Sequence, residues 1–464
     1  MLSDACKEKK ITFVMGAGSS LPFIANGYTR LSSDYLTRQI SDRDKWKAIY
    51  DEFRQNIPKN RFPEYNFNVT VEEILSVIER LKAINEREVS SKILEQVSMP
   101  LPKKIDDFYG IGKINFEHIL YLLDKLCNYL CDRKNSIDNI LFDVWEGAAQ
   151  QREMLQSKKG WNYVPYLCRE VLVKAILDLW ESCQKEQAIE KNKQFLTSVL
   201  EKFKAVSIYS LNYDPLLYEA TKEIKIDDKT FRTGFSDGEN FNLKEFYDSN
   251  NLIAFLHGHI GFVQEGMFDN MRLYDDYPNA QKRRISGVAH NQVDYCKFGD
   301  KGIHYNVHIT SGLEKFESFH DNPYSCYIQR FSKDVMESPY IVFIGGGLGD
   351  HHITLFASNA WRVINGSAKD IRNLCDRWRM PSDEQRKIVI VDDSREDYLE
   401  FLNRRSILQR LFGLFKEGIP LKWGMEEEDR ILKNNGYADF ETWFLYLKGT
   451  EQFFSEIWNI NGLF

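Results

Sequence analysis

The sequence lacks the closely spaced cysteine pairs that are typical of metal sites and disulfide-rich domains. None of its eight cysteines belongs to a C-x-x-C motif, which argues against both a zinc ribbon and a disulfide framework. The two nearest in the chain, Cys127 and Cys131, lie four residues apart on an apolar helical stripe. Core packing explains that spacing better than half of a metal site does. We therefore expect reduced thiols and no bound metal.

Long apolar runs and an excess of positive charge are also missing. No segment approaches the roughly 20 apolar residues that span a bilayer, and the N-terminal MLSDACKEKK has no apolar signal core. Lys and Arg total 61 against 68 Asp and Glu, a net charge of −7, so no global positive field attracts nucleic acid. These absences predict a cytoplasmic protein that binds neither membranes nor nucleic acid directly.

Five apolar runs read as buried strands that end in Gly, Asn, Asp or His. They are ITFVMG at 11–16, AVSIYSLNYD at 205–214, NLIAFLHGHI at 251–260, YIVFIGGG at 340–347 and KIVIVDD at 387–393. Near-continuous apolar runs are typical of parallel strands covered on both faces. They predict an α/β fold with a Rossmann-like open parallel sheet, whose strand carboxyl ends carry the ligand loops.

Helical periodicity dominates the rest of the chain. It predicts a helix at 70–81 with a Thr70 and Glu73 capping box, another that starts at an Asn115 cap, and a third at 166–183. The aromatic stretch 438–458 also reads as a helix, and 264–310 as loop-rich. We therefore expect a Rossmann-like core at 1–30 and 203–395, a helical insertion at 31–202 and a helical C-terminal segment at 396–464.

A glycine-rich turn follows the first strand. It consists of Gly16, Ala17, Gly18, Ser19 and Ser20. Glycine tolerates positive φ and adds no side-chain bulk, so such a turn can bring backbone N–H groups close to a diphosphate. A tight strand-to-helix turn that binds nothing stays an alternative, because the full dinucleotide fingerprint is longer.

Polar residues mark the ends of two further strands. Asn212 and Asp214 alternate to one side of the chain in SLNYDP. His257 ends another strand, and Gly258 after it leaves space beside the imidazole. A lone histidine is more often structural, but the convergence of several polar strand ends favours a binding site.

The segment FIGGGLGDHHI at 343–353 repeats the pattern of the first turn. Gly345 and Gly347 could admit a second part of a nucleotide. Asp350 could either accept hydrogen bonds from a ligand or cap the helix that follows, and both roles stay open. His351 and His352 would fall inside that helix and are not expected to be ligands.

These four segments, in this order, resemble the sirtuin-like family of bacterial NAD-cleaving enzymes. That family shows a GAGxS loop after its first strand, a T-x-NYD motif, a strand ending in HG and a late G-x-x-x-x-D. The resemblance covers the Rossmann-like parts alone. It implies catalysis by Asn212 and His257, and binding of NAD by the first glycine loop together with Asp214, Gly258, Gly345, Gly347 and Asp350.

The chain also departs from the protein deacylases of that family. It lacks their four-cysteine zinc module, and its first loop reads GAGSSLPFIANG without a G-I-P-x-F-R continuation. The resemblance therefore implies an NAD glycohydrolase (NADase) that depletes NAD in antiviral defence by abortive infection. A regulatory NAD or ADP-ribose sensor without turnover, a deacylase and a scaffold are the alternatives.

A toxic activity of this kind needs restraint in an uninfected cell. The resemblance implies gating by homo-oligomer assembly or by a partner such as a HerA-type ATPase or an Argonaute-like protein. The aromatic segment from Trp443 to Trp458 is the candidate contact surface.

Overall fold

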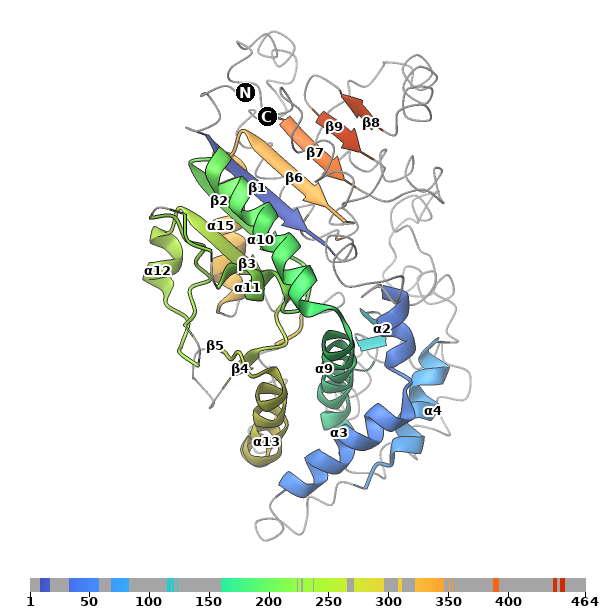
Figure 1. Cartoon of the computed structure of the whole chain (residues 1–464). Coiled ribbons are helices and arrows are strands. Elements are labelled where there is room, and N and C mark those ends of the chain that lie inside the picture. The colour runs from blue at the N-terminus through green and yellow to red at the C-terminus, as the bar shows by residue number, and fades with distance from the viewer. Residues whose placement is uncertain are drawn as a thin grey trace, which may run out of the picture. The chain divides into compact units, whose positions relative to one another are not determined.

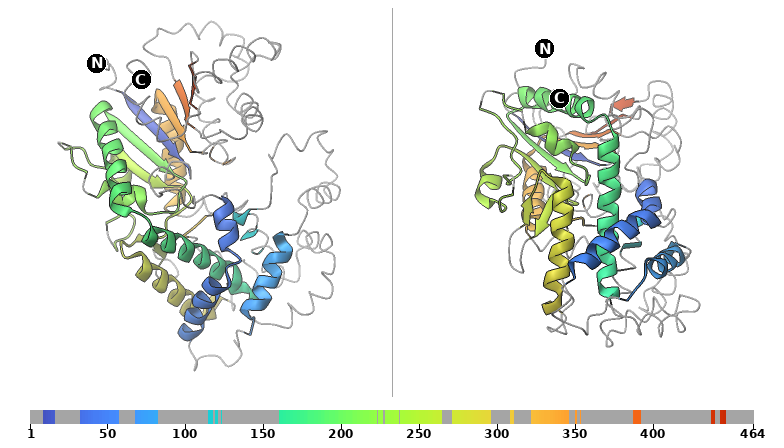
Figure 2. Two further views of the ribbon diagram at one scale, coloured as in Figure 1. Left: turned by 45° about the vertical axis from the view of Figure 1, so that its right-hand side comes forward. Right: turned by 60° about the horizontal axis from the view of Figure 1, so that its bottom comes forward.

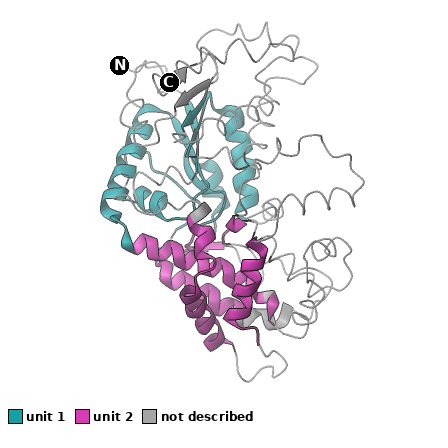
Figure 3. Cartoon of the chain, turned by 90° about the vertical axis from the view of Figure 1, so that its right-hand side faces the viewer, with its two compact units in different colours: residues 1–31, 182–259, 319–464 teal, residues 32–181, 260–318 magenta. Residues whose placement is uncertain are grey.

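The described residues form two compact units, drawn in two colours in Figure 3. The computed structural model describes residues 9–16, 33–57, 68–82, parts of 115–123, 160–264 apart from 223, 227 and 237, 271–295, 308–310, 322–345, 350, 353, 387–391, 437–439 and 443–446. The first unit comprises residues 1–31, 182–259 and 319–464, and the second comprises residues 32–181 and 260–318.

A seven-stranded sheet in the order β3-β2-β1-β6-β7-β9-β8 organises the described part of the first unit (Figure 1). All neighbouring strands pair in parallel except β8, which is antiparallel to β9. The strands are β1 (Lys10–Met15), β2 (Ala205–Ser210), β3 (Asn251–Phe255), β6 (Tyr340–Ile344), β7 (Lys387–Val391), β8 (Tyr437–Asp439) and β9 (Trp443–Tyr446). The expected α/β, Rossmann-like sheet is therefore confirmed, and all five predicted strands belong to it.

Helices cover both faces of this sheet. Phe13 of β1 packs edge-on against Phe195 of α10 (Lys185–Lys202), with ring centroids 5.5 Å apart. Tyr209 of β2 packs against Phe331 of α15 (Tyr324–Glu337) at 4.8 Å. Phe13 is level with Ile208, so Tyr209 is one residue out of phase and points to the opposite face. Consequently α10 and α15 lie on opposite sides of the sheet (Figure 2).

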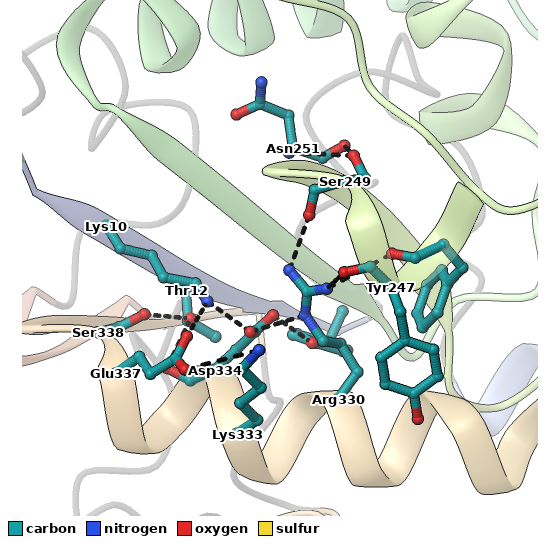
Figure 4. Close-up of polar contacts among 12 residues, drawn as sticks. Lys10, Thr12, Tyr247, Ser249, Asn251, Arg330, Lys333, Asp334, Glu337 and Ser338 are labelled. Carbon is teal, nitrogen blue, oxygen red and sulfur yellow. Dashed lines mark hydrogen bonds and ion pairs between the residues drawn. The ribbon is translucent and has the colours of Figure 1, made fainter. Parts of the chain in front are cut away.

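A buried carboxylate joins α15 to the sheet (Figure 4). Asp334 is completely buried, and its oxygens accept from Lys10 Nζ at 2.5 Å, Arg330 Nε at 2.9 Å and Tyr209 Oη at 2.6 Å. Burial, and then the Asp334 charge, hold the pKa of Tyr209 well above its ordinary value, so this phenol remains a donor. The guanidinium of Arg330 also donates to the carbonyls of Tyr247 and Ser249, which precede β3.

The second unit is mainly helical in its described part. It contains α2 (Ser33–Gln39), α3 (Arg43–Asn56), α4 (Val71–Lys82), the short 3-10 helix η3 (Trp161–Tyr163), α9 (Val164–Ser182, which ends at the unit's border) and α13 (Tyr277–Tyr295). Strands β4 (Phe262–Gln264) and β5 (Met271–Leu273) form an antiparallel pair. The predicted capping box of α4 is confirmed, because Thr70 Oγ1 accepts from Glu73 N and the Glu73 carboxylate accepts from Thr70 N.

A buried ion pair lies at the centre of the second unit. Glu170 of α9 is fully buried and accepts from Arg284 Nε of α13 at 2.8 Å and from Gln281 at 3.3 Å. The same guanidinium donates to the carbonyls of Ile260 and Phe262, each at 2.8 Å. This network fixes α9, α13 and the start of β4 to one another.

Two expectations about secondary structure are wrong. Residues 437–439 and 443–446 are strands rather than parts of a helix, in keeping with the preference of aromatic residues for pleated surfaces. The expected loop at 264–310 contains β5 and α13. The packed face of α13 includes Gln281 and Arg284, so its apolar periodicity is weak and polar pairing with Glu170 replaces it.

The borders of the units also differ from the expected domains. Helix α10 belongs to the sheet unit, although the expected insertion extended to residue 202. Residues 260–318, expected in the core, belong to the helical unit. Strands β8 and β9 extend the sheet instead of forming a separate segment. None of the described helices is long and apolar enough to cross a membrane.

Candidate functional site

The carboxyl edge of the parallel sheet is held level by backbone hydrogen bonds that continue one residue past the strands. Gly16 N donates to Ile344 O at 2.8 Å, Leu211 N to Met15 O at 2.8 Å, and Leu256 N to Ser210 O at 2.9 Å. The chain therefore leaves β1, β2 and β3 at the same level of the sheet. The sequence-predicted polar residues lie immediately beyond it.

Two glycines flank the point where the order of the sheet reverses. The chain runs outward from β1 through β2 to β3 in one direction, and from β6 to β7 in the other. The carboxyl ends of β1 and β6 thus form the switch point, the place at which open α/β sheets bind ligands. Gly16 follows β1, and Gly345 follows β6 with a φ of +72° that a side chain would strain. The backbone at this switch point carries no side-chain bulk at either glycine.

Two polar side chains follow β2. Asn212 is buried, with 9% of its surface exposed, and its backbone N–H donates to Ser210 Oγ at 3.1 Å. Asp214 is 3% exposed, and its Oδ1 accepts from Leu216 N at the start of α11 (Leu216–Thr221). Asp214 therefore orders the turn that carries Asn212. Ser210 was not among the predicted site residues.

The imidazole of His257 lies beyond β3. It is buried, and its ring centroid lies 6.1 Å from that of Tyr213. Gly258 has a φ of +96°, and its N–H donates back to Phe255 O at 3.0 Å. That tight turn requires glycine and fixes the direction in which His257 leaves the strand. Tyr213 was also missed, because its contact depends on two neighbouring strand ends.

Asp350 meets His257 across the edge of the sheet. His257 Nε2 lies 2.8 Å from Asp350 Oδ2, and each side chain is only 6% exposed. The Nε2 atom is buried and has no hydrogen bond with aligned geometry, so this contact is an electrostatic approach. Asp350 Oδ1 accepts from Ile353 N at 3.1 Å. Of the two roles that the sequence left open, the structure shows the capping contact, whereas a ligand contact stays a prediction.

This pair joins the two sides of the switch point. Strands β2 and β1 lie between β3 and β6, a span of about 14 Å at the usual strand spacing. His257 follows β3, and Asp350 follows β6. Their contact therefore joins an imidazole and a carboxylate from opposite sides of the switch point.

The structure places seven of the predicted site residues along this carboxyl edge. They are Gly16, Asn212, Asp214, His257, Gly258, Gly345 and Asp350. The remaining predicted positions lie outside the described residues: Ala17, Gly18, Ser19, Ser20 and Gly347, as do His351 and His352. Within the described ranges, no group of three or more His, Cys, Asp or Glu side chains is placed to hold a metal ion.

No known protein family is matched by the chain, and no curated protein is significantly similar to it. The resemblance to sirtuin-like enzymes therefore rests on the four short motifs.

Proposed function

We propose that the chain is an NAD glycohydrolase. In this reaction water attacks C1′ of the nicotinamide ribose, the bond from C1′ to the nicotinamide nitrogen breaks with its electron pair, and nicotinamide, ADP-ribose and one proton result. The observation that supports it is the 2.8 Å contact between His257 and Asp350 at the carboxyl edge of the sheet, where the buried Asn212 follows the neighbouring strand β2. An imidazole, a carboxylate and an amide at this edge suit a reaction that needs positioning and one base.

The binding half of the proposal uses the carboxyl ends of β1 and β6. Gly16 and Gly345 allow the diphosphate of NAD to approach the backbone closely. Asp214 and Gly258 would then shape the part of the site beneath the nicotinamide ribose. The first glycine loop, through Ser20, is proposed to complete the diphosphate contacts.

The catalytic half follows from the bond that breaks. Nicotinamide in NAD is a cationic pyridinium and leaves as a neutral molecule, so no strong acid is required, and the ribose passes through an oxocarbenium-like state. Asn212 is proposed to orient the attacking water or a ribose hydroxyl by hydrogen bonding. His257 is proposed to accept the proton that this water or hydroxyl loses.

The cellular role proposed with this chemistry is depletion of NAD in the cytoplasm during antiviral defence. Restraint would come from homo-oligomer assembly or from a partner such as a HerA-type ATPase or an Argonaute-like protein. The proposed contact surface is the aromatic segment from Trp443 to Trp458, of which the structure describes Trp443–Tyr446 as strand β9, paired with β7 and β8.

The test is nicotinamide release from NAD by the full chain at high protein concentration. Asn212→Ala and His257→Ala should each lower the rate by 100-fold or more, on the order of a lost positioning group or base. Asn279→Ala changes an exposed amide on α13 and is the matched control, with an unchanged rate. NAD that binds without being cleaved at any protein concentration would favour a nucleotide sensor instead.

A further inference from the structure

We propose that Asp350 is a positioning residue: it holds the proton of the neutral His257 ring on Nε2 and so leaves Nδ1 as the base. The inference rests on the proposed function of this site. It assigns Asp350 a different role from the contact with NAD that the family resemblance implied. The two functions of its carboxylate, toward His257 and toward the helix that follows, carry the argument.

The ring nitrogen of His257 that faces the Asp350 carboxylate is Nε2. In neutral imidazole one nitrogen carries a proton and the other presents a lone pair. At 2.8 Å from Asp350 Oδ2, with both side chains 6% exposed, a lone pair on Nε2 would face an anion with little water to screen the repulsion. A proton on Nε2 turns that repulsion into attraction. The geometry therefore selects the Nε2–H form.

The other ring nitrogen of His257, Nδ1, is the one left to act as the base. His257 Nδ1 has no hydrogen-bond partner among the residues that the structure describes. With the proton fixed on Nε2, Nδ1 is the acceptor. It can therefore take a proton from water or from a ribose hydroxyl without first changing tautomer.

A backbone hydrogen bond holds the Asp350 carboxylate itself in place. Asp350 Oδ1 accepts from Ile353 N at 3.1 Å, as a helix cap does. This bond prevents the carboxyl group from rotating freely and leaves Oδ2 directed at His257. The backbone N–H of Ile353 thus holds the carboxylate, and His257 is the group that is positioned.

Two substitutions separate positioning from capping. Asp350→Asn keeps a capping oxygen, since Asn caps helices as well as Asp does. With its oxygen bound to Ile353 N, the new amide turns its NH2 group toward His257 Nε2, and a donor there selects the opposite tautomer. Asp350→Ser also caps well but is too short to reach the imidazole.

The experiment records the ring nitrogen resonances of His257 in the full chain labelled with 15N-histidine. The signal is assigned by its loss in His257→Gln, and the pH is set where the imidazoles are neutral. The wild-type chain should carry the proton on Nε2, Asp350→Asn should carry it on Nδ1, and Asp350→Ser should show a mixture. In the same samples kcat for nicotinamide release should fall about 100-fold or more in Asp350→Asn, with a smaller change in KM and an unchanged Tm.

The two proposals fail in different ways. Nε2–H in the wild type and Nδ1–H in Asp350→Asn, without any nicotinamide release, would support the positioning by Asp350 and reject the glycohydrolase. A proton on Nδ1 in the wild type would overturn the positioning whatever the activity. So would an unchanged tautomer and kcat in Asp350→Asn, which would reduce Asp350 to a helix cap.

Discussion

Lys10 and Asp334 form a 2.5 Å ion pair although 324 residues separate them in the chain. Lys10 begins β1, whereas Asp334 belongs to α15, the helix that leads into β6. The pair therefore joins β1 to α15. Because Arg330 and Tyr209 donate to the same carboxylate, one buried anion links α15 to both β1 and β2.

Removal of this anion should be costly. Asp334→Asn removes a fully buried carboxylate, so that Arg330 loses its ion-pair partner and Lys10 keeps only the exposed Glu337. Breaking a buried ion pair in this way typically lowers the free energy of unfolding by about 3–5 kcal/mol. Urea-induced unfolding measures the change. The control Glu337→Gln removes a carboxylate that is 47% exposed and should cost about 1 kcal/mol or less; equal effects would contradict the account.

The capping box of α4 gives a local prediction. Thr70→Ala removes the hydroxyl that accepts from Glu73 N and should destabilise the helix by about 1 kcal/mol. Hydrogen exchange of the α4 amides measures this directly, because the loss of protection should begin in the first turn. Thr70→Ser keeps the oxygen and should retain most of the protection. If Ala and Ser behave alike, the hydroxyl does not cap the helix.

Gly258 next to the imidazole should tolerate no side chain. Its φ of +96° is unfavourable for alanine, so Gly258→Ala should lower the free energy of unfolding by more than about 1 kcal/mol and weaken NAD binding. Gly287→Ala is the opposite case, because it lies within α13 with nothing within 4 Å of the added Cβ. That variant should gain about 0.4–1 kcal/mol. Equal responses in urea would contradict the strained turn.

His308 should make the second unit sensitive to acid. Burial, with the charges of Arg284 and Arg169, holds its pKa well below the ordinary 6.5. Glu170 lies 3.2 Å away and would favour the cation, but both its oxygens already bind Arg284 and Nε2 has no aligned hydrogen bond. The ring of His308 also packs against the ring of Tyr166, with centroids 6.1 Å apart.

The sign of the effect follows from proton uptake. As pH falls below 6.5, His308 binds a proton in the unfolded chain, whereas in the folded chain its lowered pKa keeps it neutral. The free energy of unfolding therefore decreases, with a slope of at most about 1.4 kcal/mol per pH unit from this group. His308→Gln should flatten the dependence between about pH 5 and 6.5. A variant whose slope equals that of the wild type would show that His308 titrates normally.

The strands and their polar ends could be predicted from the sequence because they are local patterns. Each of the five apolar runs is a strand, and Asn212 and His257 follow β2 and β3 as expected. The contact between His257 and Asp350 could not be predicted, because it depends on the order of strands in the sheet. Helix α13 was missed since its buried face carries Arg284, whose partner Glu170 lies more than one hundred residues earlier.

The C-terminal strands escaped prediction for a different reason. The run Trp443–Tyr446 is four residues long and aromatic, and such a run fits a helical face as well as a pleated one. Its pairing with β7 decides between them. The sequence pattern carries no information about that partner, because β7 lies more than fifty residues earlier.

Product analysis of NAD incubated with the whole chain tests the glycohydrolase activity directly. Nicotinamide and ADP-ribose should accumulate in equal amounts, and His257→Gln should abolish both while NAD still binds. NAD that remains intact in a saturated complex at every protein concentration would contradict the hydrolysis. The absence of any NAD binding would contradict the assignment of the switch point as well.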